Sequence, residues 1–467
     1  MRSKIYTLVI LIIGLQNLSI AQFTKLADFD NIETGSYPYY IELCTDGTWL
    51  YGTASNGGIN GDGTIYKIKP DGTGFTKIFD FSEEEGTGIV PEGGLYYDGT
   101  YLYGNTKLYG AGNYGTTFKI KPDGTGFEVL VDFLGDNGSS PHGFLYDDGT
   151  YLYGITTQGG TSGGGTIYKM KRDGSDFSTI YNFAILGTGN SPYGGLISDG
   201  TYLYGMTVGG GSESSYLGTV YKIKPDGTDH QILMDCLDDP NGAYPYGSLV
   251  YDGTYLYGMT NNGGEENRGT IFKIKTDGSD YQKLLDFDDD NGAQPLGSLV
   301  LVGTTLYGMA ELGGPGIYQG TLFQIETDGS GFEGLLDFDG VNTGGYPYGT
   351  LLYTNGALFG VTNSGGVNNQ GVIFRYGEIA ESIADEKQEE LIISPNPTHG
   401  AFRILSDEIQ LNGNYRLEII NSVGEIVLRS DISSSNENIE LRNAPAGLYL
   451  IKLYSETNLY TTQLIVN

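Results

Sequence analysis

Short apolar runs alternate with glycine- and aspartate-rich turns along most of the chain. In one stretch, residues 245–251 form a short apolar run that ends at an Asp-Gly pair, and residues 254–260 (TYLYGMT) follow, rich in aromatic and β-branched side chains. Residues 269–275 (GTIFKIK) run to the next Asp-Gly pair, and residues 281–287 (YQKLLDF) complete the unit. Because Asp-Gly supplies the left-handed backbone of a tight hairpin, the pattern predicts four short antiparallel strands.

Two markers indicate that this unit occurs seven times. Leu-Tyr-Gly or a close variant recurs every 50 to 53 residues, ending at Gly52, Gly104, Gly154, Gly205, Gly258, Gly308 and Gly360. Gly-Thr, followed by a variable residue and an aromatic residue, begins at Gly63, Gly115, Gly165, Gly218, Gly269 and Gly320, with GVIF at Gly371 as the seventh copy. Four short strands in about fifty residues, repeated several times, are typical of the blades of a β-propeller.

The two ends of the repeat region complement each other. The seventh copy stops after residues 371–376 and lacks its fourth strand, whereas residues 23–29 (FTKLADF) match the fourth strand of the first copy, residues 75–81 (FTKIFDF). We expect residues 23–29 to complete the seventh blade and close a ring, because pairing them removes an exposed strand edge. The predicted fold is all-β, a seven-bladed propeller of four-stranded blades closed by the N-terminal strand.

The flanking segments predict further parts of the chain. Residues 1–21 carry two positive charges, a short apolar run and small residues before Ala21, which is the pattern of a secretory signal peptide. The apolar run is too short for a membrane span of roughly twenty residues, so we expect no transmembrane segment in the mature chain. After the propeller at 22–378, the acidic residues 379–390 predict a linker, and alternating short strands over 391–467 predict a small C-terminal β-sandwich.

Both larger parts resemble known families. Residues 22–378 resemble tandem GloVer repeats, a bacterial family with the DGTYLYG and GTIYKIKPDG phrases present here. Residues 391–467 resemble the type A sorting domain of the bacterial type IX secretion system, through PNPTHG, NSVGE and AGLYLIKL. This resemblance implies that the type IX machinery carries the protein across the outer membrane, and that its sortase then removes the domain and releases the cargo or attaches it to the cell surface. A generic β-sandwich adhesion module is the alternative for this domain.

Composition narrows the possible partners. The chain has 57 Asp and Glu against 25 Lys and Arg, a net charge of −32, which disfavours a nucleic-acid partner. Cys44 and Cys236 fall in different copies, too far apart in a ring for a disulfide, so we expect two free thiols. His142, His230 and His399 are scattered, which argues against a histidine metal cluster, and His230 is expected to fill an aromatic position.

The residues after the proline that opens each blade are the candidate binding residues. We expect them to surround the mouth of the central channel, where tyrosines beside acidic groups suit sugar rings. The candidates are Tyr39, Glu92, His142, Tyr193, Tyr246 and Tyr348, with Leu296 at the remaining position. Padding of the inner strands is the alternative role for the tyrosines.

One acidic loop is a candidate calcium site. Asp286, Asp288 and Asp290 alternate along the chain ahead of Gly292, as oxygen ligands do in calcium loops. The bidentate glutamate of an EF-hand is missing, and a solvated acidic loop is the alternative. We expect no other cofactor.

These features together predict a secreted or cell-surface repeat protein that binds carbohydrate or another surface ligand without catalysis. One alternative is a glycosidase or lyase that uses channel carboxylates, such as Glu92 with an aspartate, since glycosidases need two carboxylates close together in a cleft. A purely structural or adhesive surface protein is the other alternative.

Overall fold

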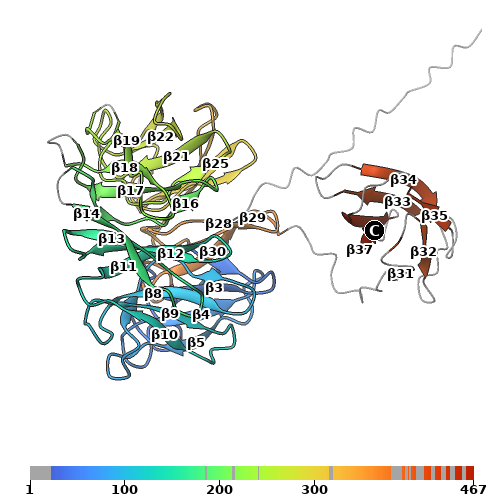
Figure 1. Cartoon of the computed structure of the whole chain (residues 1–467), viewed down its shortest axis with the longest axis horizontal. Helices are drawn as coiled ribbons and strands as arrows, with labels where there is room; N and C mark the ends of the chain where they lie inside the picture. The colour runs from blue at the N-terminus through green and yellow to red at the C-terminus, as the bar shows by residue number, and fades with distance from the viewer. Residues whose placement is uncertain are drawn as a thin grey trace, which may run out of the picture. The chain divides into compact units, whose positions relative to one another are not determined.

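The computed structural model describes residues 23–184, 187–212, 216–239, 241–314 and 319–379, together with most strands of the C-terminal part between residues 392 and 466. The chain divides into two compact units, Met1–Ala380 and Glu381–Asn467 (Figure 1). The described residues contain no helix long and apolar enough to cross a membrane. The predicted signal peptide at 1–21, His399 and nearly all of the predicted linker at 379–390 lie outside the described residues.

The described part of the first unit contains seven antiparallel sheets, one for each copy of the sequence repeat, and they are numbered here in chain order. The first three comprise β2 (Cys44–Thr45), β3 (Leu50–Ala54), β4 (Thr64–Ile68), β5 (Thr76–Asp80); β6 (Ile89–Pro91), β7 (Tyr96–Tyr97), β8 (Leu102–Leu108), β9 (Thr116–Ile120), β10 (Glu128–Asp132); and β11 (Ser139–Asp147), β12 (Leu152–Gln158), β13 (Gly163–Met170), β14 (Ser178–Ala184). The fourth and fifth comprise β15 (Asn190–Pro192), β16 (Ile197–Ser198), β17 (Leu203–Gly209), β18 (Thr219–Ile223), β19 (Gln231–Asp235); and β20 (Val250–Tyr251), β21 (Tyr255–Thr260), β22 (Thr270–Lys275), β23 (Gln282–Asp286). The last two comprise β24 (Val300–Val302), β25 (Thr305–Ala310), β26 (Thr321–Glu326), β27 (Glu333–Asp337); and β28 (Leu352–Thr354), β29 (Ala357–Thr362), β30 (Val372–Tyr376) with β1 (Phe23–Asp28).

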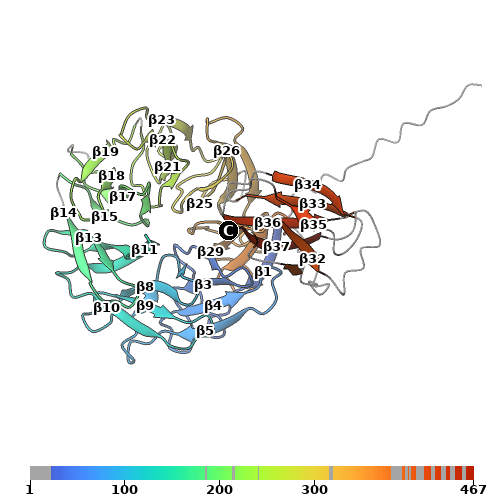
Figure 2. The ribbon, with the colours of Figure 1, turned by 45° about the vertical axis from the view of Figure 1, so that its right-hand side comes forward.

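The N-terminal strand completes the last sheet, as the sequence predicts. β1 runs antiparallel to β30, with Phe23 opposite Tyr376 and Asp28 opposite Val372. Figure 2 shows the blue β1 beside the orange strands of the seventh copy. The first and last parts of the repeat region therefore share one sheet.

The core of this unit lies between neighbouring sheets. Among the described residues, one apolar cluster joins the seventh sheet to the first, with Phe29, Tyr66, Phe359 and Ile373 fully buried in it. Six equivalent clusters join each other pair of consecutive sheets. Because every sheet packs on two neighbours, the sheets close into a ring, which Figure 2 shows from an oblique angle.

The innermost segment of the fifth copy is shorter as a strand than the sequence predicts. The expected strand over 245–251 is wrong in length, because β20 covers only Val250–Tyr251. The preceding residues bend where seven inner segments converge: a Cβ on Gly247 would collide with the carbonyl oxygen of Gly297 in the next copy. Glycine at this position allows backbones to approach closely, and the central channel is narrow as a result.

Many of the acidic residues build turns. The Asp252 carboxylate accepts the backbone N–H groups of Thr254 and Tyr255 and, through its second oxygen, the Tyr257 hydroxyl at 2.7 Å. The same three bonds recur at Asp46, Asp98, Asp148 and Asp199. The Asp-to-Tyr spacing in DGTYLYG is therefore explained by one hairpin that the two side chains stabilise together.

Two predictions about single residues are confirmed. Cys44 and Cys236 are not joined by a disulfide. His230 packs as an aromatic filler, with its ring stacked on Tyr181 at 4.5 Å.

The second unit contains seven described strands in two sheets. They are β31 (Ile392–Ser394), β32 (Ala401–Leu405), β33 (Tyr415–Ile420), β34 (Ile426–Ile432), β35 (Asn438–Glu440), β36 (Gly447–Tyr454) and β37 (Leu459–Val466). Sheet β31-β32-β35 and sheet β34-β33-β36-β37 share one apolar core, which includes Phe402, Leu417 and Ile451. The predicted small β-sandwich is confirmed.

Candidate binding site at the channel mouth

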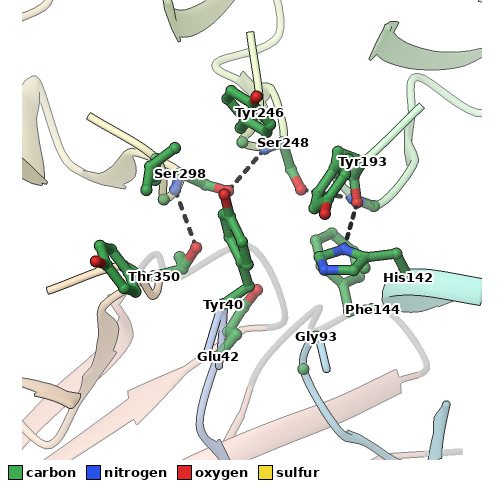
Figure 3. Close-up of a pocket in the computed structure, with 18 residues that line it drawn as sticks. Tyr40, Glu42, Gly93, His142, Phe144, Tyr193, Tyr246, Ser248, Ser298 and Thr350 are labelled. Atoms are coloured by element: carbon green, nitrogen blue, oxygen red, sulfur yellow. Dashed lines mark hydrogen bonds between the residues drawn. The ribbon is translucent and has the colours of Figure 1, made fainter. Parts of the chain in front are cut away.

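A small pocket lies on the axis of the ring, where the inner segments of the copies meet. Its wall includes Tyr40, His142, Tyr193, Tyr246 and Tyr348. The cavity left between these side chains is only about 30 Å³, which is room for about one water molecule. Figure 3 shows why: Tyr40 stands in the middle, between Ser298 and Thr350 on one side and His142 and Tyr193 on the other.

Tyr40 plugs the channel. Its ring centroid lies 4.5 Å from that of Tyr39 and 5.3 Å from those of His142 and Tyr193. Burial raises the pKa of its hydroxyl far above the usual range. Its backbone has a positive φ of 54°, an uncommon conformation for a residue with a side chain.

Sequence reasoning missed Tyr40, although a signal exists. Fourteen positions separate Pro38 from Gly52, whereas thirteen separate Pro245 from Gly258 and the equivalent pair in every other copy. The first copy thus carries one extra residue directly after its opening proline, and that is where the chain inserts a side chain into the channel.

The six predicted binding residues meet around this plug. The rings of Tyr39 and Tyr348 lie 4.9 Å apart, those of Tyr193 and Tyr246 5.2 Å apart, and those of His142 and Tyr193 4.2 Å apart. Glu92 joins the group through His142. These six residues meet at one mouth because each of them lies directly after the opening proline of its copy.

One part of the mouth is charged. The carboxylate of Glu92 lies 3.0 Å from Nζ of Lys107 and 3.4 Å from Nε2 of His142. Burial acts to raise the pKa of Glu92, but the hydrogen bond and charge of His142 and the charge of Lys107 outweigh it and lower that pKa. Nδ1 of His142 donates to the Tyr193 carbonyl at 2.9 Å. The Glu92 carboxylate is thus held by two basic side chains, of which sequence reasoning missed Lys107.

The other part of the mouth is aromatic. Tyr-Pro-Tyr occurs in the first, fifth and seventh copies, and the first tyrosine of each, at Tyr37, Tyr244 and Tyr346, has a φ between 51° and 55°. Their N–H groups donate to carbonyls of preceding loops, at 3.0, 2.8 and 2.8 Å, which hold the backbone in place. Left-handed backbone costs an L-residue roughly 1–2 kcal/mol. Sequence reasoning also missed these three residues, which the repeated YPY phrase marks.

A layer of hydroxyl groups lines the pocket beside the plug. The hydroxyls of Ser248, Ser298 and Thr350 each accept a backbone N–H from the preceding copy, at 2.7, 2.7 and 3.0 Å. Glu42 is the one carboxylate among the residues that line the pocket, and burial raises its pKa to about 7. At the mouth, Glu311 bonds the Tyr348 hydroxyl, and burial raises its pKa as well.

Two of the three aspartates in the predicted calcium loop bond to groups of the protein itself. One oxygen of Asp286 lies 2.6 Å from Nζ of Lys283, and the other accepts the N–H of Glu265 at 3.3 Å. Asp288 accepts the N–H of Asn291 within the loop at 2.8 Å, and Asp290 is exposed. In the part of the chain that the structure describes, no three His, Cys, Asp or Glu side chains are grouped to hold a metal ion. Calcium binding at this loop stays a prediction.

Sequence comparison identifies both parts of the chain. A family model described as the Gloeobacter/Verrucomicrobia repeat matches residues 16–216, 87–254 and 212–388. A model of the secretion system C-terminal sorting domain matches residues 393–467. The protein therefore carries a type IX secretion sorting domain and is exported across the outer membrane to the cell surface or the medium. No curated protein matches the chain.

Solved structures with a similar fold are distant in sequence. The extracellular domain of the putative hybrid two-component system BT4673 from B. thetaiotaomicron is 12% identical, with a TM-score of 0.51 over 96% of this chain and 59% of that chain. PorZ, an essential surface component of the type IX secretion system of Porphyromonas gingivalis, is 14% identical, with a TM-score of 0.47 over 94% and 60%. The chain thus spans about 60% of the length of these structures, and the likeness concerns the fold.

Proposed function

Since the chain belongs to the Gloeobacter/Verrucomicrobia repeat family and is exported, we propose that its propeller binds carbohydrate, without catalysis, at the tyrosine-lined mouth of its channel. The ligand rests against the mouth rather than inside the channel. Tyr40 leaves a cavity of only about 30 Å³ on the axis, which is too small for a sugar ring.

The exposure of Tyr37 and Tyr244 carries the proposal. The residue before the opening proline has left-handed backbone in all seven copies, so this conformation belongs to the fold and places the side chain at the mouth whatever the residue type. Tyr37 and Tyr244 are exposed at this position, so burial does not account for a tyrosine there. Tyrosine offers an apolar face for a sugar ring and a hydroxyl for its hydrogen bonds.

The charges at the mouth favour a neutral sugar. Lys107 and His142 hold the Glu92 carboxylate at the mouth, and so leave little positive charge for an acidic ligand. The net charge of −32 repels anionic polysaccharides in addition.

The same contacts favour binding over hydrolysis or elimination. A glycosidase needs two carboxylates roughly 5–9.5 Å apart on either side of the scissile bond. Here the partners of Glu92 are Lys107 and His142 rather than a second carboxylate.

A glycan array probed with the exported chain, with and without calcium, tests the proposal. We expect binding to neutral glycans, and we expect Tyr244→Ala with Tyr346→Ala to weaken it about thirtyfold, because each of the two aromatic contacts contributes about 1 kcal/mol. Tyr216→Ala is the matched control, since Tyr216 is exposed and has a φ of 53° but does not precede a blade-opening proline. Absence of binding to any glycan, or equal losses in both variants, would count against the proposal and favour a purely structural or adhesive role.

A further inference from the structure

Four exposed aliphatic side chains gather on the loops of the seventh and first sheets. Ile32, Ile59, Val341 and Val367 are between 59% and 79% exposed, and they are four of the five most exposed aliphatic side chains in the described residues. They lie in the loops 30–35, 56–62, 339–344 and 364–370, and we call these four side chains the aliphatic rim.

These loops touch one another in series. The N–H of Gly58 donates to the Asn31 carbonyl at 2.6 Å, which joins the loop of Ile59 to that of Ile32. The Asn368 side chain donates to the Phe29 carbonyl at 2.9 Å, which joins the loop of Val367 to the start of the loop of Ile32. A Cβ on Gly365 would collide with the Gly340 carbonyl, so the loops of Val341 and Val367 are also in contact. The four side chains therefore belong to one continuous strip of surface.

Each member of the aliphatic rim is held by the same device. An aspartate carboxylate accepts its backbone N–H: Asp30 for Ile32 at 3.2 Å, Asp80 for Ile59 at 2.9 Å, Asp339 for Val341 at 2.9 Å and Asp28 for Val367 at 2.8 Å. The hydrogen bond holds the backbone of each residue in place. Less conformational entropy is therefore lost when the side chain contacts a partner.

At one of the two loop positions, that of Ile59 and Val367, a large aliphatic residue occurs in the first and seventh copies but not in the second to fifth. The second to fifth copies carry other residues at this position, namely Ala111, Thr161, Ser212 and Glu265. The backbone N–H of each still donates to an Asp or Asn side chain on the fourth strand of its copy: Asp132, Asn182, Asp235 and Asp286. The loop needs the N–H and not an aliphatic side chain, so the turn itself does not explain isoleucine and valine here.

The surroundings of the rim are acidic. The four loops contain no lysine or arginine. Lys25 and Lys77 pair with Asp28 and Asp80, both at 2.9 Å, while Asp30, Glu33, Asp62 and Asp339 have no basic partner among the described residues. Nζ of Lys77 also donates to the Ile32 carbonyl at 3.0 Å, so one lysine lies at the rim, among a larger number of acidic groups.

We propose that the aliphatic rim docks a partner protein through a segment that combines apolar side chains with lysine or arginine. Apolar side chains of the segment cover Ile32, Ile59, Val341 and Val367, and its basic groups lie against Asp30, Glu33, Asp62 and Asp339. A second copy of this chain would bring the same acidic groups face to face, and an anionic lipid surface would be repelled in the same way. This docking surface is independent of the tyrosine mouth.

Binding of a synthetic leucine–lysine peptide to the exported full chain, measured by fluorescence anisotropy, tests the proposal. We expect the variant with Ile32, Ile59, Val341 and Val367 all replaced by serine to bind at least tenfold more weakly, and added salt to weaken wild-type binding. The matched control, Leu134→Ser with Leu237→Ser, removes two exposed leucines elsewhere and should stay within twofold of wild type. Leucine–glutamate and serine–lysine peptides should bind weakly to every form.

Other outcomes overturn the proposal. Equal peptide binding by the fourfold variant and wild type would show that charge alone drives the association. If wild type bound neutral lipid vesicles and the fourfold variant did not, the rim would be assigned to a membrane. If wild type formed a concentration-dependent dimer and the fourfold variant did not, the rim would be assigned to a second copy of the chain. If the fourfold variant melts at a lower temperature than wild type, the test is repeated with Ile59→Ser and Val367→Ser alone. This double variant changes only the two most exposed side chains of the rim.

Discussion

His230 takes the place that an aromatic ring holds in the other copies. Phenylalanine or tyrosine stands at the equivalent Phe23, Phe75, Phe127, Phe177, Tyr281 and Phe332. The imidazole stacks on Tyr181, but its Nε2 is buried without a hydrogen-bond partner, and burial lowers its pKa to about 4. The pKa in the folded state thus lies below the ordinary value of 6.5.

His230→Phe should remove an acid sensitivity. As the pH falls from 6.5 towards 4, the unfolded chain binds a proton that the folded chain does not, so wild type loses stability in that window. We expect the variant to be at least as stable as wild type at pH 7.5, and to gain a further 1–2 kcal/mol, roughly, at pH 4.5. Urea unfolding at the two pH values measures this, and an identical difference at both would refute it.

Glu42→Gln should show the opposite dependence on pH. The folded-state pKa of Glu42 is raised from 4.5 to about 7, so its stabilising contribution is present below pH 4.5 and is lost as the pH rises through 7. The variant should match wild type near pH 5 and exceed it by on the order of 1 kcal/mol at pH 8.5. Glu33→Gln, at an exposed loop position, is the control, and a Glu42→Gln advantage that is the same at both pH values would contradict this account.

Part of the candidate site was predictable from the sequence. Tyr39, Glu92, His142 and the other predicted residues share one position in the repeat, so a closed ring necessarily brings them together. The contact of Glu92 with His142 was not predictable, because it depends on where two neighbouring copies sit in three dimensions. The left-handed backbone of Tyr244 was not predictable either, since a hydrogen bond to the Leu217 carbonyl of the preceding copy fixes it.

Strands were predictable where one copy determines its own structure. The predicted runs at 254–260 and 269–275 correspond to β21 (Tyr255–Thr260) and β22 (Thr270–Lys275), which pair with each other through a local hairpin. The inner segment at 245–251 was predicted too long, because contacts between copies bend it. Local patterns thus account for the outer strands, and ring geometry accounts for the inner ones.

Lysines on the third strand of most blades connect adjacent copies. Nζ of Lys273 lies 5.0 Å from the ring centroid of Tyr255 and donates to the Thr327 carbonyl of the next copy at 3.0 Å. The same double contact occurs at Lys67, Lys169 and Lys222. A lysine at this position therefore bonds across the gap between two sheets.

Lys273→Gln should lower the free energy of unfolding by about 1 kcal/mol, because it removes a cation–π contact and a charged hydrogen bond. Lys275→Gln is the control on the same strand, since Lys275 also lies over the Tyr255 ring, at 5.7 Å, but pairs with Asp280 of its own copy instead of a carbonyl of the next one. Denaturant unfolding of both variants measures the difference. Equal effects of the two substitutions would mean that the bond across the gap contributes nothing.

At the scale of the whole molecule, ring closure and the binding mouth depend on each other. Tyr39 belongs to the first copy and Tyr348 to the seventh, and their rings are in contact only because β1 completes the sheet of β30. Phe29, directly after β1, is fully buried against both sheets. The aliphatic rim also spans these two copies, so both proposed surfaces require the closed ring.

Thermal unfolding of the exported chain with and without residues 23–29 tests this closure most directly. Deletion removes the strand paired with β30 and the buried Phe29 ring, whose loss alone costs about 3–5 kcal/mol. We expect Tm of the propeller to fall by roughly 10 °C or more, or its single transition to broaden into several steps. An unchanged Tm and a single sharp transition in the shortened chain would contradict the closed ring on which the mouth and the aliphatic rim depend.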